Sequence, residues 1–205
     1  MMEHNRQNNL WKKNFYILWA GQAISVLTSS ILQMALIWYL TAQTGSALVL
    51  SLASMAGFLP SAILGIVAGT LVDRVSRKTA MIGADLFIAA VSLVLVLASA
   101  GGELPISLVL ALLAVRSMGT ACHTPAISAA TPLIVPAEEL TRCSGYTQSL
   151  QTVGYIAGTA IAGILYPICT ISQMVAQDGF GAMADSLAVA LFPIPTHRVE
   201  QVGAG

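Results

Sequence analysis

The chain has 205 residues, of which 56% are hydrophobic and only 9% are charged. Soluble domains carry about 25% charged residues, so this chain lacks the polar surface that a water-soluble globular protein needs. Nine basic and nine acidic residues balance to a net charge of zero, which leaves no basic surface for nucleic acid. The composition therefore predicts an all-α membrane protein in a lipid bilayer and excludes a nucleic-acid partner.

The apolar runs of the sequence predict six transmembrane helices. A polar segment, residues 1–14, precedes a first span at about 15–40, which is longer than the apolar core of a signal peptide. Pro60 in the second span predicts a kink, with neighbouring helices satisfying the backbone group that it frees. The other spans are expected at about 47–72, 79–100, 106–130, 144–166 and 171–192, and a polar tail covers 193–205.

The basic residues predict the orientation of these spans. Eight of the nine fall on one side of the six-span arrangement: Arg6, Lys12, Lys13, Arg74, Arg77, Lys78, Arg142 and Arg198. Turns on the cytoplasmic side of a membrane carry an excess of Lys and Arg. We therefore expect a multi-pass protein of the cell (inner) membrane with both termini in the cytoplasm.

Arg116, the ninth basic residue, lies about halfway along the fourth span. An arginine at that depth costs at least ~2.5 kcal/mol to insert, so it should face a protein or water-lined interior and have a partner. Asp85 in the third span is the expected partner, because the two lie roughly 10–20 Å from the cytoplasmic ends of their helices. A structural ion pair and a proton or substrate relay both remain open.

Three spans carry polar residues at steps of three or four, which places each set along one helical face. The sets are Gln22, Ser25, Ser29 and Gln33 in the first span, Arg116, Thr120, His123 and Thr124 in the fourth, and Gln148, Thr152, Tyr155 and Thr159 in the fifth. For any one residue, a hydrogen bond between helices is the simpler interpretation, worth ~0.6 kcal/mol on average. Three such faces together predict a water-lined cavity.

Small residues recur every four positions in the fifth span, at Gly154, Gly158 and Ala162, with Gly163 alongside. Such a face lets another helix approach closely, so helix packing is the first interpretation and a hinge is the second.

Enzymatic chemistry has little support in the sequence. The three cysteines are unclustered and odd in number, which argues against a disulfide framework and against a metal site. No nucleophile, base and orienting group gather on one face, and no metal-ligand spacing such as His-x-x-x-His occurs. We therefore expect no enzyme activity, no cofactor and no metal.

Several motifs carry a family resemblance. The loop Gly69-Thr70-Leu71-Val72-Asp73-Arg74-Val75-Ser76-Arg77-Lys78 resembles the signature between the second and third helices of the major facilitator superfamily, with Ser76 where Gly is usual. Residues 112–116 resemble the arginine motif of its proton-coupled members, and 154–163 resemble its antiporter motif, with Thr159 in place of Pro. Further segments, at 19–23, 31–35, 57–60, 82–86, 123–126 and 145–151, are similar to the macrolide-efflux branch of drug:proton antiporters. The resemblance covers about residues 10–195.

This resemblance implies a mechanism. Members of the family have twelve spans in two halves, with the substrate site between them, so the chain corresponds to the N-terminal half. Alternating access would move amphipathic, macrolide-like drugs outward in exchange for protons. The residues that would latch one state are Gly69, Asp73, Arg74, Arg77 and Lys78. Protons would titrate Asp85 or Asp178, with Arg116 tuning the pKa.

The sixth span departs from an ordinary apolar helix. Asp178 and Asp185 each cost ~2.5–3.5 kcal/mol on insertion scales, and at seven residues apart they share one face. The helix is therefore marginal unless that face is buried or wet. Two functions remain open: a proton-coupled exporter completed by a homodimer or a second half, and a truncated membrane fragment that is inert or binds a full-length relative.

Overall fold

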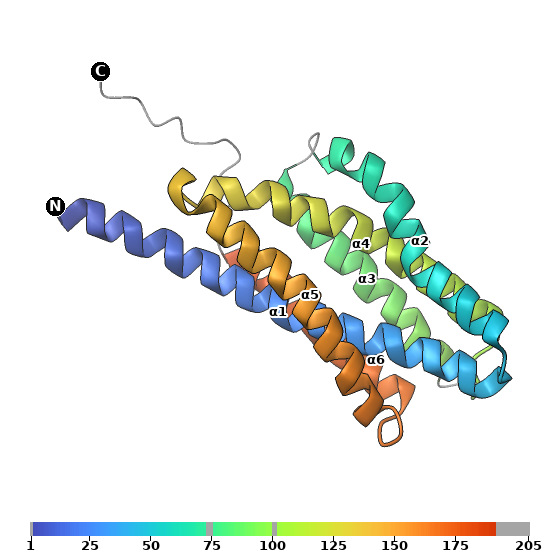
Figure 1. Cartoon of the computed structure of the whole chain (residues 1–205). Coiled ribbons are helices and arrows are strands. Elements are labelled where there is room, and N and C mark those ends of the chain that lie inside the picture. Colours follow the sequence, from blue (N-terminus) through green and yellow to red (C-terminus); the bar gives the residue numbers. More distant parts are fainter. Residues whose placement is uncertain (1, 73–75, 100–101, 192–205) are drawn as a thin grey trace.

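A computed structural model describes residues 2–72, 76–99 and 102–191 as a bundle of long helices (Figure 1). The elements are α1 (Met2–Thr44), α2 (Ala47–Val72), α3 (Arg77–Ser99), α4 (Ile106–Ile134), the 3-10 turn η1 (Ala137–Glu139), α5 (Leu140–Leu165) and α6 (Ile171–Leu191). The expected all-α class is confirmed.

Two helices are longer than the spans expected from hydropathy. α1 begins at Met2, inside the polar segment, because no Gly or Pro interrupts the chain before Gly21. α4 continues to Ile134, and its end has a local cause: Val135 is extended, with φ −103° and ψ 134°, as expected for a residue that precedes a proline. Apolar runs thus predict the part of a helix that lies in the membrane, whereas glycine and proline residues predict where the helix ends.

Among the described residues, four helical segments are long and apolar enough to cross a membrane: Trp11–Thr44, Ala47–Ala68, Arg77–Ser99 and Ile106–Ile134. Polar residues lower the hydropathy of α5 and α6, which are not in this set. A membrane protein is therefore supported by four helices, and the full count of six spans stays a prediction.

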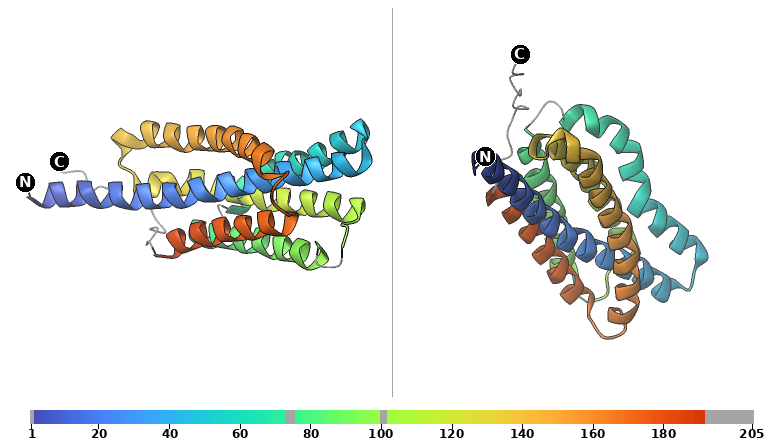
Figure 2. Two further views of the ribbon diagram at one scale, coloured as in Figure 1. Left: turned by 90° about the horizontal axis from the view of Figure 1, so that it is seen from below. Right: turned by 60° about the vertical axis from the view of Figure 1, so that its left-hand side comes forward.

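The packing order places two helices at the centre of the bundle. α1 packs against α5 and α6, which lie on opposite sides of it (Figure 2). α4 packs against α2 and α3, and α3 packs in turn against α6. α1 and α4 also contact each other, so polar residues on their inner faces meet those of several neighbours.

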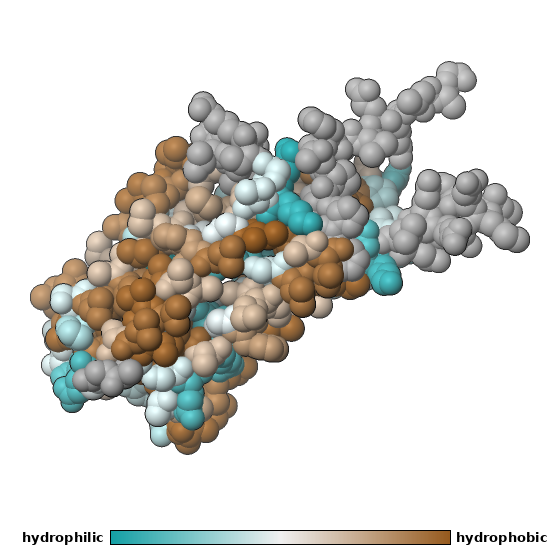
Figure 3. All heavy atoms as spheres, turned by 180° about the vertical axis from the view of Figure 1, so that it is seen from behind, coloured by the Kyte–Doolittle hydropathy of each residue, from teal (hydrophilic) through white to brown (hydrophobic). Residues whose placement is uncertain are grey.

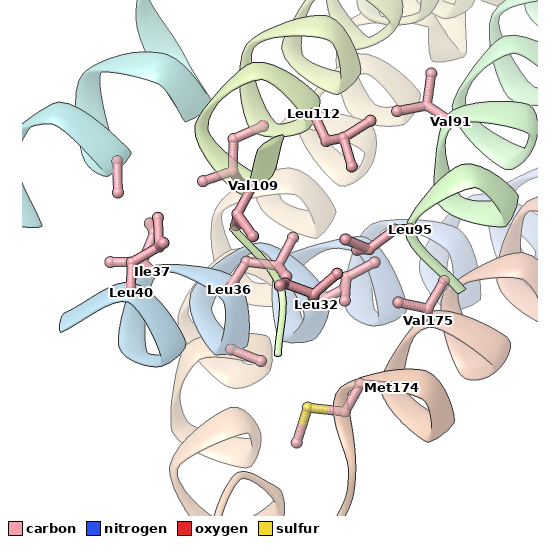
Figure 4. Close-up of a cluster of buried hydrophobic side chains, with 14 residues drawn as sticks. Leu32, Leu36, Ile37, Leu40, Val91, Leu95, Val109, Leu112, Met174 and Val175 are labelled. Atoms are coloured by element: carbon pink, nitrogen blue, oxygen red, sulfur yellow. The ribbon is translucent and has the colours of Figure 1, made fainter. Parts of the chain in front are cut away.

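A buried apolar cluster joins α1, α3, α4 and α6 (Figure 4). The cluster contains Leu32 and Leu36 of α1, Leu95 of α3, Leu113 of α4 and Met174 of α6. Because lipid tails are as apolar as leucine, the cluster stabilises the bundle through close packing rather than through removal of apolar surface from water.

The outer surface is rich in large hydrophobic side chains, and the face in Figure 3 is mostly hydrophobic with hydrophilic residues mainly toward its ends. Leu48, Ile66 and Ile168 are 69%, 82% and 72% exposed. Exposed apolar surface on this scale is a liability in water and the normal condition in lipid. The surface agrees with the composition in placing the chain in a membrane.

Contacts between helix termini gather the described basic residues other than Arg116 at one end of the bundle. Phe15 packs with Val135 and Cys143, which joins the N-terminal part of α1 to the end of α4 and the start of α5. Lys78 Nζ donates to the carbonyl of Ala190 at 2.8 Å, which joins the start of α3 to the end of α6. The described cations near these termini are Lys12, Lys13, Arg77, Lys78 and Arg142.

The backbone around Pro60 inside α2 uses partners on neighbouring helices. The N–H of Ser61 donates to Ser117 Oγ of α4 at 3.0 Å. Gln33 Nε2 of α1 donates to the carbonyl of Gly57 at 3.4 Å. Neighbouring helices thus provide partners for two backbone groups beside the proline, those of Gly57 and Ser61.

We expect Ser117→Ala to lower the free energy of unfolding by about 1 kcal/mol, because the N–H of Ser61 loses its acceptor on the neighbouring helix. Reversible unfolding in mixed detergent micelles, followed by circular dichroism, measures the change. Ser107→Ala, an exposed position on the same helix, is the control and should stay within about 0.5 kcal/mol of the parent. Equal effects of the two changes would contradict a stabilising role for the Ser117 hydroxyl.

Candidate functional site

Polar side chains from four helices form two layers across the bundle. The arginine layer consists of Ser29 (α1), Ser92 (α3), Arg116 (α4) and Asp178 (α6), and the histidine layer consists of Gln22 (α1), Asp85 (α3), His123 (α4) and Asp185 (α6). On every one of the four helices the two members are seven residues apart. Seven residues are about two helical turns, or roughly 10 Å, so the layers are parallel.

The arginine layer is a satisfied ion pair. Arg116 Nη1 lies 2.6 Å from Asp178 Oδ2, and the two side chains are only 8% and 1% exposed. Ser92 Oγ donates to Asp178 Oδ2 at 3.0 Å and also accepts a hydrogen bond from Arg116 Nη1. Ser29 Oγ donates to Asp178 Oδ1 at 2.7 Å. Both carboxylate oxygens thus have donors, and one positive charge meets one negative charge.

The expected pairing of Arg116 with Asp85 is wrong, because Arg116 pairs with Asp178. On α3 the residue level with Arg116 is Ser92, and Asp85 lies two turns closer to the start of that helix. The sequence places both residues in one range of depth, roughly 10–20 Å from the ends of their helices. It does not indicate that α6 supplies the carboxylate at the deeper level.

The histidine layer has a different arrangement. His123 Nε2 lies 3.1 Å from Asp85 Oδ1 and 3.1 Å from Asp185 Oδ2. Gln22 Nε2 donates to Asp185 Oδ2 at 2.6 Å, and Ser186 Oγ donates to Asp85 Oδ2 at 3.1 Å. Three titratable groups from three helices therefore share one buried site.

Charge and hydrogen bonding in this layer do not balance. Two carboxyl groups face a single imidazole, so with both of them ionised the net charge is −1 even when His123 is protonated. One ring N–H cannot fully serve two oxygens, and Asp185 Oδ1 and Gln22 Oε1 make no hydrogen bond within the described part of the chain. An uncompensated buried charge is costly, so this layer favours the binding of a cation.

The three titratable groups can share one ion, because an atom from each lies within 4.8 Å of the other two. The expectation of no metal site rested on spacing along the chain, and that spacing does not test a group assembled from α3, α4 and α6. Asp185 itself was missed as a site residue. The available signal was a matching interval of seven residues, from Asp178 to Asp185 and from Arg116 to His123.

A cleft of about 170 Å³ opens beside the two layers, between α1, α2, α4 and α5. Of the residues expected to line a cavity, those found here are Ser25, Ser29, Gln33, Thr120, His123, Thr124 and Tyr155. Asp85 also reaches this cleft. Gln22 instead lies in the histidine layer, 3% exposed.

Three of the four residues expected on α5 do not line the cleft: Gln148, Thr152 and Thr159. Gln148 and Thr152 are exposed, and Gln151 lines the cleft together with Tyr155. The inward face of α5 is therefore rotated by about one residue from the expected one. The reason is that the small residues of this helix, and not its polar ones, set which side meets α1.

The glycines of α5 bring that helix close to α1. A Cβ at Gly158 would lie 2.5 Å from Ser30 Cβ, and one at Gly163 would lie 3.1 Å from Trp38. Gly154 is likewise buried, facing Val26. These contacts fit helix packing as the role of the small-residue face.

The loop expected to act as a latch is described only in part. Asp73 and Arg74 lie outside the described residues, and Gly69 lies in the last turn of α2. Arg77 and Lys78 start α3, where Lys78 reaches the last turn of α6.

Residues 7–200 match the family of transmembrane secretion effectors, MFS_3. The chain belongs to this family of major facilitator superfamily transporters, and its macrolide-efflux resemblance is confirmed. It is 54% identical over 187 residues to Macrolide efflux protein A of Streptococcus pyogenes and 50% identical over 151 residues to the protein of the same name in Enterococcus faecalis. It is 26% identical over 156 residues to the MFS-type transporter YvqJ of Bacillus subtilis.

These alignments cover 91%, 74% and 76% of the chain, but only 46%, 46% and 37% of the three relatives. The chain thus spans about half the length of the curated relatives it matches. No solved structure gives a significant match.

Proposed function

We propose that the chain is the first six-span half of an exporter of amphipathic, macrolide-like drugs that works by proton antiport. The observation that carries the proposal is the 54% identity to Macrolide efflux protein A over 91% of the chain. The cleft adds physical support, because it brings hydroxyl, amide and aromatic groups of four helices together beside buried charges. An amphipathic molecule needs such a mixture of polar and apolar contacts.

In the proposed topology, residues 15–192 form six spans, and residues 1–14 and 193–205 are cytoplasmic. The described cations at one end of the bundle support this orientation. α5 and α6 cross the membrane in this arrangement, and the two acidic residues of α6 face protein. Asp178 and Asp185, the costliest residues of α6, are 1% and 0% exposed.

Export proceeds by alternating access against a second half, supplied by another copy, a separate chain or a longer parent chain. The cleft then forms part of the substrate site between the halves. Gly69, Asp73, Arg74, Arg77 and Lys78 latch one state. The contact of Lys78 with Ala190 supports this role, because it places a cation at the C-terminal, negative end of the α6 dipole.

The charge relay of this proposal involves Asp85, Arg116 and Asp178. The geometry divides their roles. Arg116 and Asp178 neutralise each other away from the cleft, whereas Asp85 lines the cleft, where water and substrate can reach it.

Erythromycin accumulation in cells that lack their own efflux pumps tests the function. The chain is expressed alone and also with the C-terminal half of the Streptococcus pyogenes relative, at membrane levels confirmed by an epitope tag. We expect the pair to lower accumulation several-fold and Asp85→Asn to abolish that effect. Unchanged accumulation in both arms would overturn the proposal and favour a fragment that does not transport.

A further inference from the structure

We propose that the histidine layer is the cation-exchange site of this chain, with Asp185 as the group that holds the exchanged proton. The site binds a proton in one state and the positive charge of an amphipathic cation in the other. This inference rests on the proposed function and deepens it, since it names the coupling residues and the substrate class.

The two layers differ in their balance of charge. In the arginine layer one guanidinium meets one carboxylate, and both oxygens of Asp178 accept hydrogen bonds. In the histidine layer two carboxylates meet one imidazole. Both layers lie between the same helices, and Asp178 and Asp185 are 1% and 0% exposed, so solvent reaches neither of these two carboxylates. One additional positive charge makes the histidine layer neutral, whereas it would unbalance the arginine layer.

Hydrogen bonding places the proton. A carboxylate only accepts hydrogen bonds, whereas a protonated carboxyl group also donates one. Asp185 Oδ1 is buried and has no hydrogen-bond partner among the described residues, and Gln22 Oε1 of the same layer is an acceptor in the same condition. Asp85, by contrast, has a partner at each oxygen, His123 at Oδ1 and Ser186 at Oδ2. A proton on Asp185 therefore gives a buried oxygen without a partner a hydrogen atom to donate. A proton on Asp85 would instead fall on an oxygen that already has a partner.

The position of the cleft provides the exchange route. Asp85 and His123 line it, and Asp185 lies behind them with 0% exposure. A cation in the cleft therefore meets Asp85 first. Its charge stabilises the ionised carboxylate of Asp85 and opposes a second positive charge at His123. His123 then gives its Nε2 proton to water in the cleft and takes the proton of Asp185 in its place, so one charge enters as one leaves.

No other charge among the described residues competes with this exchange at close range. α1 presents the uncharged Gln22 to Asp185, α3 presents Asp85 and α4 presents His123. The next charges are the neutral Arg116–Asp178 pair, two turns away. Lys78 lies near the end of α6, with its Nζ on the carbonyl of Ala190.

Tetraphenylphosphonium binding to the purified chain in lipid nanodiscs tests the site. This cation has no titratable group, so any pH dependence belongs to the protein. We expect one proton released per cation bound, measured with an indicator dye. Binding should become up to tenfold tighter for each unit by which the pH rises, over the range where the site titrates. Asp185→Asn should reduce the proton release to near zero and flatten the pH dependence.

Two variants sharpen the result. Glu138→Gln neutralises an exposed acid and should release as many protons as the parent. The double change Arg116→Gln and Asp178→Asn removes the arginine layer; loss of proton release there, with Asp185→Asn unaffected, would overturn the assignment. Absence of tetraphenylphosphonium binding to the parent would also overturn it.

Infrared spectroscopy of the parent covers the case in which Asp185→Asn does not fold. The carbonyl band of a protonated carboxyl group should be present at low pH and disappear when tetraphenylphosphonium binds; a band that does not respond would contradict the proposal. Proton release without export in cells would uphold the site and reject the proposed function. Export in cells without cation-linked proton release would reject the site and uphold the proposed function.

Discussion

Asp178→Ala is expected to destabilise the bundle by about 3–5 kcal/mol, because it leaves the charge of Arg116 buried without a partner. Arg116 is 8% exposed on its side chain, so water cannot take the place of the lost carboxylate. Reversible unfolding of the purified chain in mixed micelles, followed by circular dichroism, measures the loss. The yield of monodisperse protein after detergent extraction should fall in parallel.

A double change provides the matched control for this pair. Arg116→Met together with Asp178→Leu removes both charges at similar volume, and most of the lost stability should return. Glu139→Ala breaks an exposed pair, in which Glu139 Oε2 lies 3.7 Å from Arg142 Nη1, and should cost less than about 1 kcal/mol. Additive losses in the double variant would show that Arg116 and Asp178 contribute independently.

Gly158→Ala is expected to cost about 1–3 kcal/mol by overpacking the contact between α5 and α1. A Cβ at this position would lie 2.5 Å from Ser30 Cβ and 3.1 Å from the carbonyl oxygen of Leu27. A backbone oxygen cannot rotate away as a side chain can, so α5 must shift. The same unfolding experiment measures the cost.

Gly145→Ala on the same helix is the control, since no atom lies within 4 Å of its added Cβ. Ala is favoured over Gly in a helix by up to about 1 kcal/mol, so this change should stabilise the protein. The two identical substitutions should therefore have opposite signs. A gain in stability from Gly158→Ala would show that α5 and α1 are less tightly packed than the structure indicates.

The sequence predicts where each helix lies in the chain better than it predicts which other helices pack against it. Apolar runs locate all six helices, because hydropathy depends on local composition. The extra length of α1 depends on the absence of breakers before Gly21, which the polar composition of that segment hides. The expected gathering of polar residues at a cleft holds for α1 and α4, whose polar faces look toward the bundle centre.

The candidate site shows the limit of such reasoning. Periodicity gives the direction of a residue only relative to its own helix, so it does not tell which helix lies opposite. Depth alone therefore indicates Asp85 as the partner of Arg116, whereas in the structure the partner is Asp178 of α6. On α5 the polar face predicted Gln148, but close packing of the glycines against α1 turned Gln151 toward the cleft instead.

Every buried ionic contact described above belongs to α3, α4 and α6, α1 adds hydrogen bonds from Ser29 and Gln22, and none belongs to α2 or α5. The four helices are thus fastened to one another at two levels, and α2 and α5 border the cleft from outside that frame. A tilt of either helix can widen or narrow the cleft without separating a pair of opposite charges. Contacts between charged groups thus hold the inner helices together, whereas α5 is held to α1 by the close packing of small residues.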